Sequence, residues 1–203
     1  AAARTWSPDF WKASGGGGTV WNGMTFDPEL NRIYLGVGNG SPWNQKIRSP
    51  GGGDNLFLCS IVALDARTGR VKWHYQETPG DSWDFTATAP MVLTRLKVDG
   101  EERPVVLHAP KNGFLYVLDR RDGKLLRANP IVRVNWTKGI DPRTGVPIPN
   151  PEEADYAQGA KIATIVCGLV SVAVLVVGAR LAFYPGYDGR GLRSSPPPRE
   201  PRS

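Results

Sequence analysis

The chain has 203 residues, a length that allows one ordinary domain or a large part of a longer protein. Its net charge of +6 is concentrated near the C-terminal end, because residues 160–203 contain six Lys/Arg and two Asp/Glu. Residues 1–159 therefore lack the basic stripe of a nucleic-acid-binding surface. Two cysteines, Cys59 and Cys167, are too few for a disulfide framework or a metal cluster, and we interpret them as buried or incidental thiols.

The first predicted element is a β-hairpin over residues 24–38. Met24-Thr-Phe26 and Ile33-Tyr-Leu35 are strand-like and flank Asp27-Pro-Glu-Leu-Asn31, which has the composition of a turn. Seven tryptophans and 24 glycines in the chain also favour a turn-rich β protein over a helix bundle.

Two later hairpins, over residues 60–75 and 114–126, share one pattern. Each has an apolar run, Asp-x-x-x-Gly, a basic residue and a second apolar run, and Asp119 follows Asp65 at an offset of 54 residues. A repeat of about 50 residues is typical of the blades of a β-propeller. Two unrelated hairpins are the alternative.

The tryptophan in the first copy of this repeat has a predicted role. Trp73 follows Gly69 closely, and we expect its ring to dock one blade on the next. The second copy has Arg127 in place of this tryptophan, so the repeat is degenerate there.

The C-terminal part changes character. Residues 162–179 form an uncharged run of eighteen residues between Lys161 and Arg180, which meets the lower length limit for a membrane-spanning helix. Translation in the wrong reading frame, or a truncated gene joined to unrelated sequence, is one interpretation. A membrane anchor and buried propeller strands are the others.

Three regions follow from these changes in composition. We predict a partial propeller over 1–157, an apolar segment over 158–183 and a disordered tail rich in Pro, Arg and Ser over 184–203. A single-span membrane protein with a small β head is a competing interpretation of the apolar segment.

Three polar residues on separate loops are candidates for chemistry. Asp84 can take a proton, the amide oxygen of Asn39 can bind a hard cation, and the ammonium of Lys111 can stabilise a developing oxyanion. Each has a simpler alternative: Asp84 as a turn residue bonding local amides, Asn39 in a left-handed turn position, and Lys111 as a solvated turn lysine. Trp21 is by composition alone more typical of a core.

Several separated motifs occur in one order along residues 4–156. They are Gly18-Thr-Val-Trp21, Gly36-Val-Gly-Asn-Gly-Ser-Pro-Trp-Asn44, Pro50-Gly-Gly-Gly-Asp-Asn-Leu-Phe57, Trp73-His-Tyr-Gln76, Thr78-Pro-Gly-Asp-Ser-Trp-Asp-Phe85 and Ala109-Pro-Lys-Asn-Gly-Phe-Leu-Tyr-Val-Leu-Asp119. In this order they resemble the quinoprotein alcohol dehydrogenases, the methanol and ethanol dehydrogenase-like enzymes that use pyrroloquinoline quinone (PQQ) and calcium. The resemblance implies an all-β fold: part of an eight-bladed β-propeller, here about three blades of four-stranded antiparallel sheets.

The resemblance also implies a role for each matching residue. Trp21 would lie flat against one face of the quinone, and Thr19 would hydrogen-bond its edge. Asn39 would give its side-chain oxygen to Ca²⁺. Asp84 would be the general base, and Lys111 would donate to the quinone oxygen at the reacting carbonyl.

One further position bears on the metal. The lanthanide-using branch of this family has an extra aspartate two residues after the base, where this chain has Thr86. Threonine resembles the calcium branch. The glutamate that also binds the metal in the family, and its disulfide between adjacent cysteines, have no counterpart in this sequence.

The function implied is oxidation of primary alcohols to aldehydes, with electrons passing to a cytochrome c in the periplasm. We expect the isolated chain to be inactive, because blades that the family requires are not in it. We also expect an open propeller arc to favour association, for example as a homo-oligomer, because its edge strands and blade faces are uncovered. The alternative is a non-catalytic propeller scaffold of the outer-membrane assembly type, which would not need this set of polar residues.

Overall fold

The computed structural model describes residues 2–7, 12 and 15–151. The chain divides into two units, residues 1–157 and 158–203, and the described residues belong to the first. The predictions of an apolar segment over 158–183 and a disordered tail over 184–203 lie outside the described residues. Within residues 2–7, 12 and 15–151, no helix has the length and hydropathy needed to cross a membrane.

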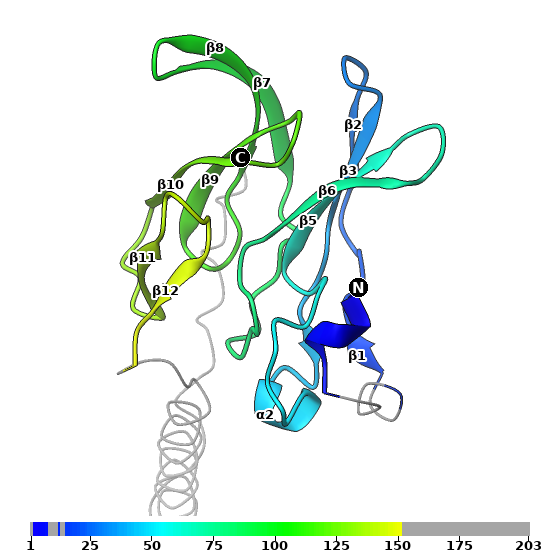
Figure 1. The fold of residues 1–203 in the computed structure, drawn as a ribbon, viewed down its shortest axis with the longest axis vertical. Helices are drawn as coiled ribbons and strands as arrows, with labels where there is room; N and C mark the ends of the chain where they lie inside the picture. Colours follow the sequence, from blue (N-terminus) through cyan, green and yellow to red (C-terminus); the bar gives the residue numbers. More distant parts are fainter. Residues whose placement is uncertain (1, 8–11, 13–14, 152–203) are drawn as a thin grey trace, which may run out of the picture. The chain divides into compact units, whose positions relative to one another are not determined.

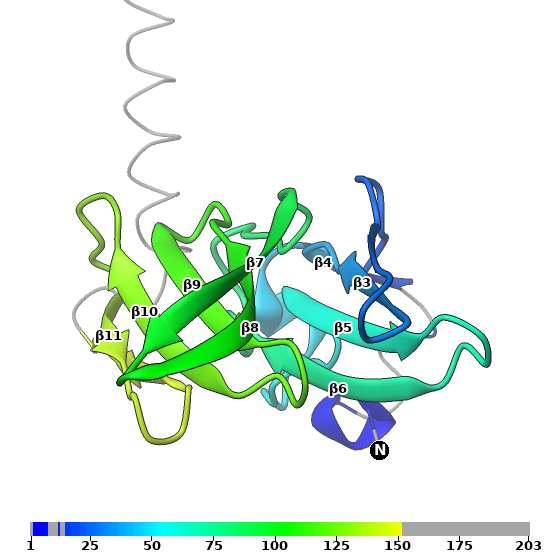
Figure 2. The same cartoon turned by 90° about the horizontal axis from the view of Figure 1, so that it is seen from above.

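Two four-stranded antiparallel sheets dominate the fold (Figure 1). The first sheet has the order β2 (Thr25–Asp27), β3 (Arg32–Gly36), β5 (Ser60–Asp65) and β6 (Val71–Gln76). The second has the order β7 (Met91–Val98), β8 (Glu101–His108), β9 (Phe114–Asp119) and β10 (Leu125–Pro130). Seen from above, the two sheets lie side by side (Figure 2). Each is a meander, the arrangement of a propeller blade.

Shorter elements surround these sheets. β1 (Gly16–Gly17) pairs with β4 (Gly40–Ser41), and β11 (Thr137–Ile140) pairs with β12 (Pro147–Pro149). Regular helices in the described part of the chain include the 3-10 turn η1 (Ala2–Thr5) and the four-residue α2 (Gln45–Arg48). The predicted all-β, propeller-type fold is therefore confirmed.

The three predicted hairpins are confirmed as β2–β3, β5–β6 and β9–β10. The β7–β8 hairpin was not predicted, although its two strands are the longest of the described residues. Most of β7 is exposed or half-buried, and charged residues such as Arg95 and Lys97 interrupt its apolar alternation. That composition hides a strand from pattern analysis, because the strand lies on a solvated surface.

The two predicted repeat turns have the same hydrogen bonds. Gly69 donates its N–H to the carbonyl of Asp65 over 2.8 Å, and Gly123 donates to Asp119 over 2.9 Å. Both glycines have positive φ, 69° and 76°, which a residue without Cβ adopts readily. The two turns are therefore structurally equivalent, as the repeat predicts.

A third turn of this kind was not predicted. Gly145 donates to the carbonyl of Asp141 over 2.7 Å, within the segment Asp141-Pro-Arg-Thr-Gly145. Its spacing matches Asp65-Ala-Arg-Thr-Gly69, so the sequence contained the signal. The hydroxyl of Tyr75 on β6 donates to the carbonyl of Gly145 over 2.8 Å, which docks this turn on the first sheet.

The predicted docking role of Trp73 is confirmed. Its Nε1 donates to the carbonyl of Arg120 over 3.0 Å, and its ring lies so close to Gly123 that a Cβ there would be 2.5 Å from Cε3. Trp73 thus joins β6 of the first sheet to the turn after β9 of the second. It belongs to a buried cluster that includes Tyr34, Ile61, Val106, Phe114, Tyr116, Leu118 and Trp136.

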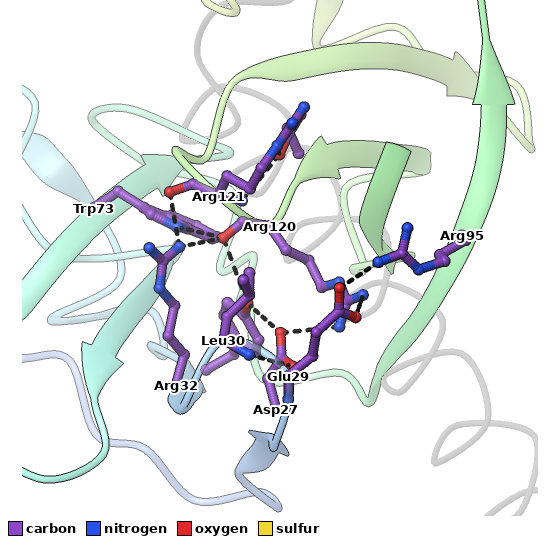
Figure 3. Close-up of polar contacts among 10 residues, drawn as sticks. Asp27, Glu29, Leu30, Arg32, Trp73, Arg95, Arg120 and Arg121 are labelled. Atoms are coloured by element: carbon purple, nitrogen blue, oxygen red, sulfur yellow. Dashed lines mark hydrogen bonds and ion pairs between the residues drawn. The ribbon is translucent and has the colours of Figure 1, made fainter. Parts of the chain in front are cut away.

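Charged side chains also join the two sheets (Figure 3). Arg120 donates from Nη1 to Asp27 Oδ2 and from Nη2 to Glu29 Oε2, both over 2.9 Å. Arg32 of β3 donates to the carbonyls of Arg120 and Arg121. Asp27 is fully buried and Arg120 nearly so, so this is an internal ion pair between sheets rather than a surface pair.

Candidate functional site

Loops from both sheets bring together three predicted site residues. Asn39 lies between β3 and β4, Asp84 between β6 and β7, and Lys111 between β8 and β9. Asn39 Nδ2 donates to Asp84 Oδ1, and Lys111 Nζ lies 3.9 Å from Asp84 Oδ2. The side chains of Asp84 and Lys111 are about half exposed, at 51% and 55%. The acid, the amide and the amine therefore form one solvent-accessible group.

The carboxamide of Asn39 is oriented by its nitrogen. Nδ2 donates to Asp84 and to the carbonyl of Gly40, the latter over 3.1 Å. No hydrogen bond from the described residues reaches Oδ1, so this oxygen is available to a cation or a donor. Asn39 is not among the described residues with positive φ, so a left-handed turn does not account for it.

Asp84 itself has a left-handed backbone, with φ of 59°. Its side chain turns to Asn39 and Lys111, and the local amides are bonded by Asp81 instead. Asp81 Oδ1 accepts from the N–H groups of Trp83 and Phe85 over 3.1 and 3.2 Å. The local capping role considered for Asp84 therefore belongs to Asp81.

Asp81 is a fully buried carboxylate that the sequence analysis did not assign to the site. Burial raises its pKa to about 6, against the lowering effect of the amides of Trp83 and Phe85 and of the charge of Arg48. Its burial depends on residues distant in sequence, such as Arg48, so no local motif could have shown it.

Thr19 and Trp21 adjoin the Asn39 turn through Gly38. The N–H of Gly38 donates to the carbonyl of Thr19 over 3.0 Å. A Cβ at Gly38 would be 2.1 Å from Trp21 Cζ3, so the indole requires a glycine at this position. Trp21 is 55% exposed and thus is not a core residue here. Thr19 is also exposed, and its backbone contact is with Gly38 rather than with Asp84 or Lys111.

An aromatic cluster supports the loop that carries Asp84. The rings of Trp83 and Phe85 lie 5.5 and 5.6 Å from the ring of Trp136, measured between centroids. Trp136 is buried and donates from Nε1 to the carbonyl of Asn112, the residue after Lys111. This cluster was not predicted from the sequence.

A buried histidine ties both ends of the same loop to β8. His108 Nδ1 lies 2.6 Å from Glu77 Oε1, and its Nε2 lies 3.0 Å from the carbonyl oxygen of Ala89. Because a carbonyl only accepts, Nε2 carries a proton. Burial alone would lower the pKa of His108, but the charge of Glu77 and the hydrogen bonds to Glu77 and Ala89 outweigh it and raise the pKa.

Within the described residues, no group of three or more His, Cys, Asp and Glu is arranged to hold a metal ion. Cys59 is a free, buried thiol, as predicted, and Cys167 lies outside the described residues. The described site does offer the free amide oxygen of Asn39 and the nearby Asp84 carboxylate. These are oxygen donors of the kind that hard divalent cations prefer.

A family model described as the β-propeller domain of glucose, ethanol and alcohol dehydrogenases matches residues 1–138. The quinohemoprotein alcohol dehydrogenase of Comamonas testosteroni is 62% identical over 148 residues, which are 72% of this chain and 21% of that protein. The dehydrogenase subunit of a quinone alcohol dehydrogenase from Komagataeibacter europaeus is 54% identical over 152 residues, covering 74% of this chain and 21% of that protein.

Solved structures agree with these matches. The crystal structure of the Comamonas testosteroni enzyme has a TM-score of 0.71 and 60% identity, covering 74% of this chain and 22% of that one. A europium-containing methanol dehydrogenase has a TM-score of 0.68 and 44% identity, covering 73% of this chain and 25% of that one.

The fold and these relatives together place the chain in the quinoprotein class of β-propellers. The chain belongs to the PQQ-dependent alcohol dehydrogenase family. It spans about a fifth of the length of the curated relatives it matches.

Proposed function

We propose that this chain carries the base-bearing side of the active site of a PQQ- and calcium-dependent dehydrogenase that oxidises primary alcohols to aldehydes. The observation that supports this most directly is the contact of Asp84 with both Asn39 and Lys111. A scaffold protein would have no need for a half-exposed acid, amide and amine converging from three loops.

The residues present suit the cofactor and its metal. The free oxygen of Asn39 would bind Ca²⁺, and Lys111 would hold the quinone oxygen at its reacting carbonyl. The exposed indole of Trp21, seated against Gly38, would cover one face of the planar ring, and Thr19 would bind the ring's edge. The quinone, when bound, supplies the electrophilic carbonyl that accepts hydride.

Asp84 is the residue that handles the substrate's proton in this proposal. Its carboxylate accepts the hydroxyl proton of the alcohol as the C–H bond is broken. Asn39, donating to Oδ1, leaves Oδ2 facing Lys111 and the solvent-accessible side. The ammonium of Lys111 stabilises the negative charge that develops on an oxygen beside it.

We infer calcium rather than a lanthanide from Thr86. Its hydroxyl lies 3.0 Å from that of Thr88, and it adds no negative charge beside Asp84. A trivalent ion would be better matched by a further carboxylate. We also propose a cytochrome c as electron acceptor, because one relative, 46% identical over 155 residues, is named lupanine 17-hydroxylase [cytochrome c]. A periplasmic location is proposed from the family alone.

A chimera tests the assignment of Asp84. Residues 15–138 would replace the matching segment of the Comamonas testosteroni enzyme, and ethanol-dependent dye reduction would be measured with Ca²⁺ and PQQ. We expect the chimera to be active and Asp84→Asn to lower kcat by about 10²–10⁴-fold, the usual contribution of a general base. Asp99→Asn is the matched control, since Asp99 is also exposed and has a positive φ of 52°. Equal activity of the two variants would disprove the role of Asp84.

The isolated 203-residue chain should not turn over ethanol under the same conditions. It spans only about a fifth of its relatives, so most of the propeller that encloses their site is not in it. We expect weak, Ca²⁺-dependent binding of PQQ in equilibrium dialysis, reduced in Asn39→Ala and unchanged in Asn150→Ala. Ethanol turnover by the purified chain would contradict this expectation.

A further inference from the structure

Asp84 has a backbone conformation that its own side chain does not stabilise. Its φ of 59° is in the left-handed region, which residues with a Cβ seldom adopt. Its carboxylate bonds Asn39 and lies near Lys111, away from the local backbone. Other residues must therefore hold the backbone around it.

Asp81 makes the contacts that could do this. Its Oδ1 accepts from the N–H of Trp83, which precedes Asp84, and from the N–H of Phe85, which follows it. One buried oxygen atom thus binds the peptide group that follows Asp84 and the peptide group that precedes Trp83. The other oxygen, Oδ2, is buried without a hydrogen-bond partner among the residues that the structure describes, which is unfavourable for stability.

The backbone of Asp81 is itself held by buried residues from the segment between β4 and β5. Its carbonyl accepts from Arg48 Nη2 over 2.6 Å, and the same nitrogen donates to Asn55 Oδ1 over 3.1 Å. Arg48 and Asn55 are both fully buried. The thiol of Cys59 also donates to the carbonyl of Phe85 over 3.0 Å. The backbone that carries the Asp81 carboxylate is therefore held by buried contacts.

The side chains on either side of Asp84 have a different packing partner from Asp84 itself. Trp83 and Phe85 both pack against buried Trp136. The carboxylate of Asp84 instead contacts Asn39 and lies near Lys111. The hydrogen bonds of Asp81 and the aromatic packing thus act on the same two residues and converge on the orientation of Asp84.

We propose that Asp81 is a positioning residue that holds Asp84 in its left-handed conformation, facing Asn39 and Lys111. This inference rests on the proposed role of Asp84 as the base. Asp81 acts through the geometry of its acceptor oxygen, and its negative charge is not required. An asparagine in its place offers the same acceptor.

Two substitutions in the full 203-residue chain separate geometry from charge. Asp81→Ala removes the acceptor, whereas Asp81→Asn keeps it and removes the charge. Asp65→Ala is the matched control, because Asp65 Oδ1 accepts from the N–H groups of Arg67 and Thr68 in an equivalent way, on the remote β5–β6 turn.

Nuclear magnetic resonance provides the readout. The one-bond Cα–Hα coupling of Asp84 differs between positive and negative φ, and amide exchange at Trp83 and Phe85 reports their hydrogen bonds. We expect Asp81→Ala to change the coupling and to speed exchange by about tenfold or more, as loss of protecting hydrogen bonds does. Asp81→Asn should leave the coupling of Asp84 unchanged and keep amide exchange within about threefold of the unsubstituted chain. Asp65→Ala should alter neither.

Equilibrium dialysis with PQQ and Ca²⁺ measures whether the orientation of Asp84 affects quinone binding. We expect Asp81→Ala to weaken binding about tenfold and Asp81→Asn to preserve it. If Asp84 keeps positive φ in Asp81→Ala, or if Asp81→Asn behaves like Asp81→Ala, the positioning role is overturned. If the coupling changes as expected but the unsubstituted chain binds no quinone, the positioning of Asp84 is supported and the proposed function fails instead.

Discussion

Asp81 and Asp84 are three positions apart, yet their surroundings give them different chemistry. Asp84 is half exposed and lies 3.9 Å from the ammonium of Lys111, so its carboxylate is open to solvent. Asp81 is fully buried, and burial raises its pKa to about 6. The exposed acid, Asp84, was predicted because the motif around it resembles that of a known family. The buried acid was not predicted, because burial depends on Arg48 and other residues far away in the sequence.

The raised pKa of Asp81 predicts a pH dependence of stability. The native state binds the proton more tightly than the unfolded state, so the contribution is favourable below pH 3.8 and is lost as pH rises to about 6. The difference corresponds to about 3 kcal/mol. Urea unfolding between pH 4 and 7 should show a smaller decline for Asp81→Asn than for the unsubstituted chain.

A matched control for this measurement is Asp122→Asn, at an exposed turn position. We expect it to leave the pH dependence unchanged. If the stability of Asp81→Asn and of the unsubstituted chain fell equally with pH, ionisation of Asp81 would not destabilise the native state.

At the scale of elements, the hairpins with repeated turns were predictable and the solvated hairpin was not. The pattern Asp-x-x-x-Gly identified β5–β6 and β9–β10, because its hydrogen bonds are local and depend on few residue types. The third turn, ending at Gly145, follows the same rule. The β7–β8 strands gave no such pattern, since β7 is mostly exposed or half-buried and β8 begins with the charged residues Glu101, Glu102 and Arg103.

The two predicted repeat turns differ in what lies above their glycines, which gives a paired prediction. Gly69→Ala should lower the free energy of unfolding by about 1–2 kcal/mol, the cost of left-handed φ, because nothing lies within 4 Å of a Cβ there. Gly123→Ala should lower it by more than about 3 kcal/mol, because its Cβ would also be 2.5 Å from Cε3 of Trp73.

Urea unfolding of the two variants checks this prediction. Replacing Trp73 by Leu in the Gly123→Ala background should remove the steric part of the difference. Equal losses of stability in the two alanine variants would mean that Trp73 does not dock tightly on its neighbour.

At the scale of the whole described unit, the two sheets are joined by a buried ion pair between Arg120 and Asp27. Breaking such a pair by removing one partner leaves a buried charge, which costs about 3–5 kcal/mol. Arg120→Met should have an effect of this size, because it leaves Asp27 fully buried. Arg127→Met, which removes an exposed pair with Asp99, should cost at most about 1 kcal/mol.

Chemical unfolding of the two methionine variants distinguishes these cases. A loss of less than about 1 kcal/mol for Arg120→Met would show that Asp27 gains water or another partner when the guanidinium is removed. This pair could not be predicted, because its partners are widely separated in sequence and join different sheets.

Strand β6 holds two different turns of the described unit. Trp73 holds the turn that follows β9, and Tyr75, two positions later, holds the turn that precedes β12. Arrays of repeats commonly come apart one module at a time, because each module touches only its immediate neighbour. Here a single strand reaches two successive modules, so its release would free both together. Disassembly should accordingly be an all-or-none event rather than a stepwise peeling from one end.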